Sequence, residues 1–255
     1  MKKFLRIFLI AMIVLIIATV IVAAEFLDDI VKKGVETLGP QITKVTISLD
    51  AVHIGLFTGS ASVKNLVVGN PEGYEAPQAI SVGLAEVGVN PFSILTDKIV
   101  VRSINIKSPD ITFEGGLGGN NLSRILDNVN ATAKAGGPPS ANTNAVAKAG
   151  GKSAKKIEVD DLLITGAKVQ GTLILFGGQK VTIPSLSLPD IHLTNLGKGS
   201  DGLTPTDLTR AVLNAITSAT VKAIGSEVTD IGKNAGNLGK DADKIKKGLG
   251  GLFNK

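Results

Sequence analysis

The sequence predicts a mainly β protein with flanking helices, and three observations support this fold class. Apolar residues make up 44% of the 255 and are mostly aliphatic, aromatic residues make up only 4%, and 30 glycines interrupt the chain. This composition favours strands and turns over helical bundles. A strand-like spacing of apolar residues recurs along the chain, and the only long apolar run lies at the amino terminus, outside the predicted strands.

Residues 1–24 predict a transmembrane helix. The charges of the opening MKKFLR precede 18 uncharged residues at 7–24. As a helix these span about 27 Å, close to the hydrocarbon core of a bilayer. Acidic residues follow at once, so the positive-inside rule places the amino terminus in the cytoplasm and the body across the membrane. A cleaved signal peptide ending in VAA at 22–24 is the alternative, although its apolar core is usually about 7–15 residues.

The recurring spacing reads apolar-x-apolar-x-x-apolar-x-apolar and occurs six times. The sets are Ile47/Leu49/Val52/Ile54, Ala61/Val63/Leu66/Val68, Val82/Leu84/Val87/Val89, Ile99/Val101/Ile104/Ile106, Ile157/Val159/Leu162/Ile164 and Leu186/Leu188/Ile191/Leu193. A strand bulged at the x-x pair would keep all four side chains on one face, whereas a tight hairpin would use x-x as its turn. No x-x pair contains Gly, which such turns prefer, so bulged strands are favoured. Because bulges bend strands, we expect a curved antiparallel sheet, a groove or half-barrel in two blocks.

The chain divides into five segments on these signals. They are a transmembrane anchor (or signal) at 1–24, a helix plus the first β-groove block at 25–129, a flexible linker at 130–156, a second β block at 157–200 and C-terminal amphipathic helices at 201–255. In the first block we expect a helix at 26–38 ended by Gly39-Pro40, strands at about 42–55, 60–69, 78–90, 98–107 and 110–114, a helical turn at 91–95 and a short helix at 121–129 capped by Asn120 or Asn121. The linker contains almost nothing that could enter a core.

The C-terminal segment begins with a helix expected at 205–224. From 224 to 252 the apolar residues advance in alternating steps of four and three, which is a heptad pattern. Seven glycines within this stretch each cost about 1 kcal/mol of helix stability. We therefore expect 224–252 to be helical only when docked on a surface, which would be a membrane, a partner or the protein's own sheet.

Composition argues against several function classes. The absence of Cys excludes disulfides and thiolate chemistry, and the two His residues, His53 and His192, lie too far apart to suggest a metal site. The net charge of +5 is spread along the chain and few aromatics are present to stack bases, so nucleic acid is not an expected partner. Gly151-Lys152-Ser153 lacks the rest of a phosphate-binding loop. We expect no cofactor and no catalytic residues, and hence no enzyme.

Several stretches within residues 4–215 resemble the AsmA-like family, which would make this chain a short, single-anchor member. They are the anchor, "FLDDIVKKGVETLGPQITKVTISLDAVHIGLFTGSASVKNLVVGNPEGY", "SILTDKIVVRSINIKSPDITFEG", "GGNNLSRILDNV" and, in the second block, "IEVDDLLITGAKV" and "VTIPSLSLPDIHLTNLG". The most telling residues are Gly59, Asn65-Leu66, Asn70-Pro71, Ser108-Pro109-Asp110 and Asn121-Leu122. The resemblance implies a single-pass inner-membrane protein with its body in the periplasm and a β-groove with an apolar interior. It implies membrane lipid as the partner in cell-envelope biogenesis. Separately, the C-terminal helix, which needs a surface to dock on, is where other envelope proteins are expected to bind.

The expected lipid contacts are the apolar residues that the spacing keeps on one face of the first block. They are Ile47, Leu49, Val52, Ile54, Val82, Leu84, Val87, Val89, Ile99, Val101, Ile104 and Ile106. The alternative function is a non-enzymatic structural or interaction scaffold, in which the same face is a closed β core.

Overall fold

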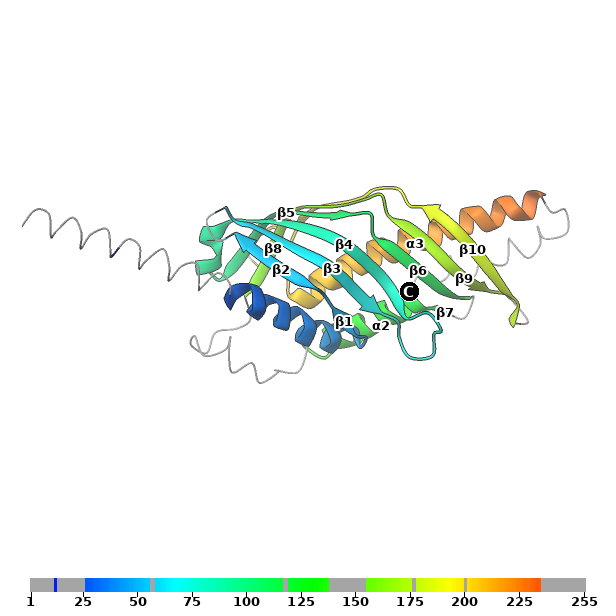
Figure 1. Ribbon diagram of the computed structural model, residues 1–255, viewed down its shortest axis with the longest axis horizontal. Coiled ribbons are helices and arrows are strands. Elements are labelled where there is room, and N and C mark those ends of the chain that lie inside the picture. Colours follow the sequence, from blue (N-terminus) through cyan, green and yellow to red (C-terminus); the bar gives the residue numbers. More distant parts are fainter. Residues whose placement is uncertain are drawn as a thin grey trace, which may run out of the picture.

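One large sheet dominates the computed structural model, which describes residues 12, 26–55, 58–116, 119–137, 155–175, 178–199 and 201–234 (Figure 1). Its strands are β1 (Ile47–Ser48), β2 (Ala51–Gly55), β3 (Ser60–Gly69), β4 (Gln78–Val89), β5 (Lys98–Lys107), β6 (Asp110–Gly116), β7 (Gly119–Asn120), β8 (Lys156–Thr165), β9 (Lys168–Ile174), β10 (Lys180–Ser187) and β11 (Ile191–Leu196). The helices are one at residues 26–43, the 3-10 helix η1 (Pro91–Leu95), α2 (Asn121–Lys134) and α3 (Pro205–Asn234).

Several pairs of strands lie end to end, beside one longer strand or beside another such pair. β1 and β2 both pair with β3, and β5 and β6 both pair with the same side of β4. β8 and β9 pair with β5 and β6 in turn, and β11 and β10 lie outermost beside them. The two predicted strand blocks therefore form one continuous, curved sheet, a half-barrel that curls around α2 and α3 (Figure 1).

The expectation of a wholly antiparallel sheet is wrong at the seam between the two blocks. β5 pairs with β8 and β6 with β9 in parallel, and each residue faces the one 58 positions later, from Lys98 with Lys156 to Gly116 with Ile174. A parallel neighbour requires a long return connection. Here α2 and the segment up to residue 155 supply it.

The phase slips are sites where neighbouring strands reset their pleat together. One row of resets crosses the sheet through Asn65, Ser108 and Gly166, whose φ angles are +51°, +48° and +63°. β3 keeps one register with β1 and β2 on both sides of this row, so the partner strand resets at the same level. A second row passes Arg102, where β5 carries an extra residue against β4. β3, β4, β5 and β8 continue through their x-x pairs, and the other two pairs lie between strands that do not pair with each other. The hairpin alternative is therefore excluded, and the bulged alternative is confirmed at Arg102, where β5 carries the extra residue.

The helix at 26–43 closes the edge of the sheet. The Asp28 carboxylate accepts a hydrogen bond from the Ile54 amide at 2.9 Å, and the Glu36 carboxylate accepts one from the Leu49 amide at 3.2 Å. The Lys32 ammonium donates to the Asp50 carbonyl at 2.9 Å. These side chains satisfy backbone groups that an open edge strand would present to other chains.

Two helices run farther than the sequence predicts. The first continues through Gly39-Pro40 to residue 43, because Asn128 and Thr132 of α2 donate to the carbonyls of its last turn at 2.9 and 3.1 Å. α2 itself continues beyond 129 to Lys134, into the predicted linker, because Thr132 is buried against that turn. The rest of the predicted linker, 138–154, lies outside the described residues.

α3 extends ten residues past the predicted end at 224, to Asn234. Thr204 and Asp207 cap its start: the Thr204 hydroxyl donates to the Asp207 carboxylate at 2.6 Å and accepts from the Asp207 amide at 3.1 Å. The later part of the heptad pattern, 235–252, lies outside the described residues.

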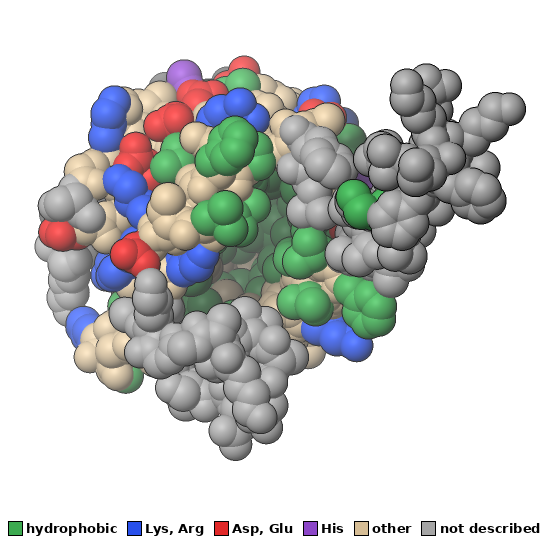
Figure 2. Space-filling view, turned by 90° about the vertical axis from the view of Figure 1, so that its left-hand side faces the viewer, with side chains coloured by type: hydrophobic (Ala, Val, Ile, Leu, Met, Phe, Trp, Pro, Cys, Tyr) green, Lys and Arg blue, Asp and Glu red, His purple; other side chains and the backbone are tan. Residues whose placement is uncertain are grey.

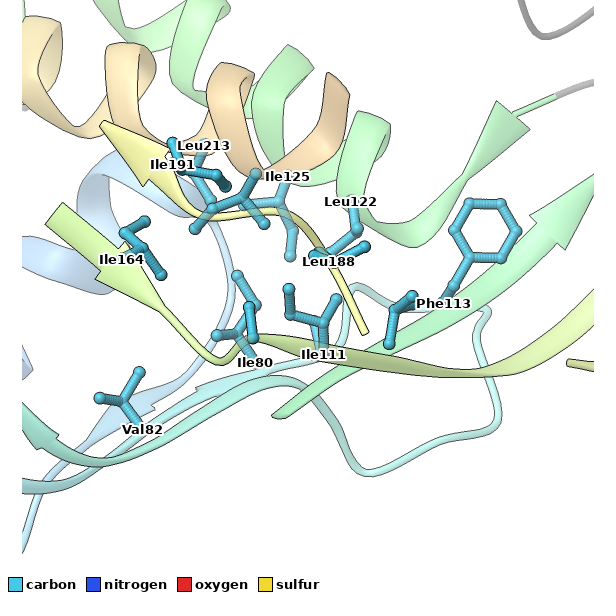
Figure 3. Close-up of a cluster of buried hydrophobic side chains, with 14 of the residues drawn as sticks. Ile80, Val82, Ile111, Phe113, Leu122, Ile125, Ile164, Leu188, Ile191 and Leu213 are labelled. Atoms are coloured by element: carbon cyan, nitrogen blue, oxygen red, sulfur yellow. The ribbon is translucent and has the colours of Figure 1, made fainter. Parts of the chain in front are cut away.

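The core lies between the concave face of the sheet and the two covering helices. Figure 3 shows Ile80 and Ile111 from the sheet pointing toward Leu122 and Ile125 of α2 and Leu213 of α3. All five side chains are at most 6% exposed. The helices therefore fill this end of the half-barrel as a closed core.

No helix among the described residues is long and apolar enough to cross a membrane. The predicted anchor at 1–24 lies outside the described residues apart from Met12.

Candidate functional site

The structure places eleven of the twelve predicted contact residues on the concave face of the sheet. The exception is Leu84, which pairs with Lys64 on one side and Lys107 on the other. Directly paired residues share a face, and both lysines are exposed, so Leu84 lies on the outer surface. The pleat of β4 resets at Gly83, not at Ala85-Glu86 as predicted, and Ala85 takes the inward position instead.

The inward residues form rows that cross strands from both blocks. One row runs from Ile54 through Ala61, Val87 and Ile104 to Leu162. A parallel row runs Val52, Val63, Ala85, Ile106 and Ile164. Register alone thus makes the concave face one continuous apolar surface.

Burial divides this surface into two ends. Toward α2 and α3 its side chains are fully buried, as at Ile111 and Val169, which are at most 1% exposed. At the other end most inward side chains of β2 to β5 are only half-buried, whereas Leu162 and Ile164 of β8, in the same rows, are at most 1% exposed. We call this half-buried set the open strip: Ile54, Ala61, Val63, Val87, Val89, Ile99, Ile104 and Ile106.

The open strip lies at the end of the molecule that Figure 2 shows. That view shows a hollow whose wall is formed by hydrophobic side chains. Polar and charged side chains cover much of the outer surface around it. The arrangement offers a concave, apolar binding surface with an open mouth, which suits an acyl chain far better than a polar substrate.

The sequence model of the AsmA family matches residues 1–173, about two thirds of the chain. This chain belongs to the AsmA family. No curated protein matches it. Membership indicates an envelope-associated protein and confirms the resemblance seen in the sequence.

The residues that carried the resemblance hold the turns of this AsmA-family fold. The Glu114 carboxylate accepts hydrogen bonds from the amides of Glu75 and Ala76 at 2.6 and 2.9 Å. The Asn121 side chain accepts from the Glu114 amide and donates to the Asn70 side-chain oxygen at 2.8 Å. This clasp fixes the loop between β3 and β4 at the closed end of the half-barrel, so these residues position the groove rather than line it.

Close backbone approach explains one further telling residue. Gly59 adopts φ +64°, and a Cβ there would lie 2.3 Å from the Val89 carbonyl oxygen. The Val89 amide donates to the Gly59 carbonyl at 2.6 Å. Only glycine lets the β2–β3 turn sit this close to the end of β4, at the mouth of the groove.

The sequence shows the apolar spacing of the second block, but it does not lead us to expect its residues beside the first block on the concave face. Ile157, Val159, Leu162 and Ile164 lie beside Ile99, Val101, Ile104 and Ile106 of β5. The signal that could have found them is the likeness of KIVVRSINIKSPDI at 98–111 to KIEVDDLLITGAKV at 156–169. Two strands with the same spacing and the same resets can lie in register side by side.

The polar groups near the site serve structural contacts. His53 is 80% exposed beside Asp28, and His192 pairs with Asp161 on the outer surface. Within the described ranges, no three His, Asp or Glu side chains are grouped to hold a metal ion. A cavity of about 330 Å³ lies between the start of the first helix and β2, lined by Phe26, Asp50 and Val52 among others, and the Asp50 carboxylate accepts from Asn65 at 2.6 Å.

Proposed function

We propose that this AsmA-family protein is a single-pass, membrane-anchored periplasmic protein that binds acyl chains of membrane lipid along the open strip during cell-envelope biogenesis. It acts by binding, without catalysis. The 1–24 segment supplies the anchor, and other envelope proteins are expected to bind through the C-terminal helix.

The observation that supports this proposal is the contrast between the two ends of one apolar face. An exposed apolar surface is unfavourable by about 25 cal/mol per Å², so a face that continues beyond its covering helices calls for another apolar partner. A lipid tail is apolar and flexible, so it can lie along a concave apolar surface. Family membership, which indicates an envelope-associated protein, puts such tails within reach.

The scaffold alternative has an observation of its own. α2 and α3 close the other end of the concave face with a dense core. If lipid never enters the mouth, this closed end defines the protein as an interaction module with an imperfectly covered face.

Photocrosslinking distinguishes the two functions. A photoreactive residue is placed at Val87, on the open strip, and in a matched variant at Leu84, on the outer surface of the same strand. We expect lipid adducts from position 87 and none from position 84 after irradiation of cells, detected by mass spectrometry of the purified chain. Equal yields, or no adduct from either position, would reject the lipid proposal.

Charge insertion gives a second test. In Val87→Asp with Ile104→Asp, the new carboxylates border the hollow and remain solvated, so the protein should fold but lose lipid adducts from a photoreactive residue at Val89. Unfolding of this variant would instead indicate a closed core, because an unpaired buried carboxylate costs several kcal/mol.

The anchor is tested separately. The purified protein should begin at Met1 and remain in the membrane pellet after carbonate washing. Amino-terminal sequencing that begins at Glu25 would show a cleaved signal.

A further inference from the structure

The mouth of the groove carries a cluster of apolar side chains that the fold leaves in water. On η1, Phe92 is 79% exposed, Leu95 86% and Ile94 43%. Phe26, at the start of the first helix, is 66% exposed. At the opposite end, Val181 is the comparable exposed hydrophobic side chain among the described residues, at 40%.

η1 is held by polar contacts that do not involve these side chains. The Asn90 side chain accepts from the Phe92 amide at 3.1 Å, and the Ser93 hydroxyl accepts from the Val100 amide at 2.9 Å. The Thr96 hydroxyl donates within the turn, and the Lys155 ammonium donates to the Ile94 carbonyl. The fold thus fixes a rigid turn, yet its hydrogen bonds do not require that its outward residues be a phenylalanine and a leucine.

This end of the molecule is also where the amino-terminal apolar segment joins the body. The Asp28 carboxylate accepts a hydrogen bond from the amide of Ile54, which is one of the last two residues of β2. η1 connects the end of β4 to the start of β5. It lies at the same end of the molecule as the end of β2, because Gly88, near the end of β4, pairs with Ser60 at the start of β3. Phe26 therefore lies next to the mouth. It follows the apolar run at 7–24 by only two positions.

We propose that η1 is a membrane-docking element: Phe92 and Leu95 insert into the interfacial region of the lipid bilayer and hold the mouth of the groove against it. The partner that η1 binds is the bilayer surface, not a protein. Apolar and aromatic side chains on a fixed turn bind at that depth, and the segment at 7–24 brings the bilayer to this end. The inference rests on the membrane placement in the proposed function but not on lipid entering the groove.

A single-tryptophan experiment tests the docking, because the chain contains no Trp. The full chain carrying Leu95→Trp is reconstituted in phosphatidylcholine–phosphatidylglycerol vesicles, with and without brominated acyl chains. Val181→Trp, an exposed apolar position at the far end, is the matched control. We expect bromolipid to quench the tryptophan emission of the Leu95→Trp variant strongly, with a blue shift, and to leave the emission of the Val181→Trp variant unchanged.

Three outcomes overturn the inference. Absence of quenching in the Leu95→Trp variant shows that η1 stays in water. Equal quenching at both ends shows that the body lies flat on the membrane. A blue shift at position 95 that needs an added envelope protein, without bromolipid quenching, shows that the occupant is a protein.

The docking and the groove can fail independently. A photoreactive residue at Val87 in the same vesicles reports lipid in the groove. Quenching at position 95 without adducts at position 87 leaves a scaffold docked on the membrane. Adducts at position 87 without quenching show that the groove takes up lipid without docking through η1. Phe92→Ser with Leu95→Ser should abolish the docking while the circular dichroism spectrum stays unchanged, and a retained membrane contact at this end would count against η1.

Discussion

β5 and β6 lie end to end, and replacing one isoleucine by alanine in each of them tests whether the half-barrel is open at one end. Ile111 in β6 is 1% exposed beneath α2, whereas Ile104 in β5 is half-buried on the open strip. Ile111→Ala removes a fully packed side chain and leaves a cavity, so it should cost about 4 kcal/mol within the usual 2–5. Ile104→Ala loses less packing because its neighbourhood is already open, and should cost about 1–2 kcal/mol.

Urea unfolding of the full chain in detergent, followed by circular dichroism, measures the two costs. Leu84→Ala on the outer surface is the control, with an expected cost below about 1 kcal/mol. On heating, Ile111→Ala should lower Tm by about 8–16 °C, given 2–4 °C per kcal/mol for a chain of this size. Ile104→Ala that destabilises as much as Ile111→Ala would refute the open mouth.

Three further predictions follow from polar contacts. Glu114→Gln should cost about 1–3 kcal/mol and accelerate hydrogen exchange in the 70–77 loop, because glutamine has one acceptor oxygen and leaves one of the two backbone amides facing its NH2 group; unchanged exchange would contradict the clasp. The hydrogen bond from Thr204 lowers the pKa of Asp207, so its stabilisation of α3 is present above about pH 4 and lost as the pH falls through the lowered pKa; the stability difference between the wild type and Asp207→Asn should shrink in that acidic range. Thr217→Val should stabilise the protein by up to about 1 kcal/mol, because the buried Thr217 hydroxyl has no partner within the described residues; a destabilised variant would show that the hydroxyl is satisfied.

The sequence predicts most strands because their apolar spacing is an intrinsic property of each strand. The resets at Asn65 and Arg102 are readable, since both leave two apolar residues three positions apart. The parallel seam is not readable in the same way. Which strand becomes the neighbour of β5 depends on the return through α2, and a spacing pattern describes one strand without naming its partner.

Leu84 shows where single-strand reasoning fails at the site. Leu84 and Ala85 are both apolar, so the sequence allows the reset of β4 on either side of them. The neighbouring strands decide: Lys64 and Lys107 must face solvent, and they pair with Leu84 from both sides. The same register puts Val63 and Ile106 beside Ala85 on the concave face. Cross-strand pairs therefore choose the face when local hydrophobicity does not.

The position of the helices indicates that the fold leaves the open strip uncovered, and not that the helices are too short to cover it. α3 has 30 residues and is about 45 Å long, yet it packs mainly against β8, β10, β11 and α2. α2 packs against β6 and β7, so the concave side of β2 to β5 near the mouth is left to neither helix as a main contact.

Imperfect packing would scatter exposed apolar surface over the whole molecule. Here the half-buried strip, the outward side chains of η1 and Phe26 gather at the end where the amino-terminal apolar segment joins the body, while Ile30 and Val31 farther along the first helix and Val181 on β10 are also exposed. Water disfavours each of these surfaces for the same reason, and a bilayer with its acyl chains would cover all of them at once. A protein partner would have to match a hollow, a rigid turn and a helix start together. The common location therefore favours lipid as the partner of both the open strip and the exposed side chains of η1 and Phe26.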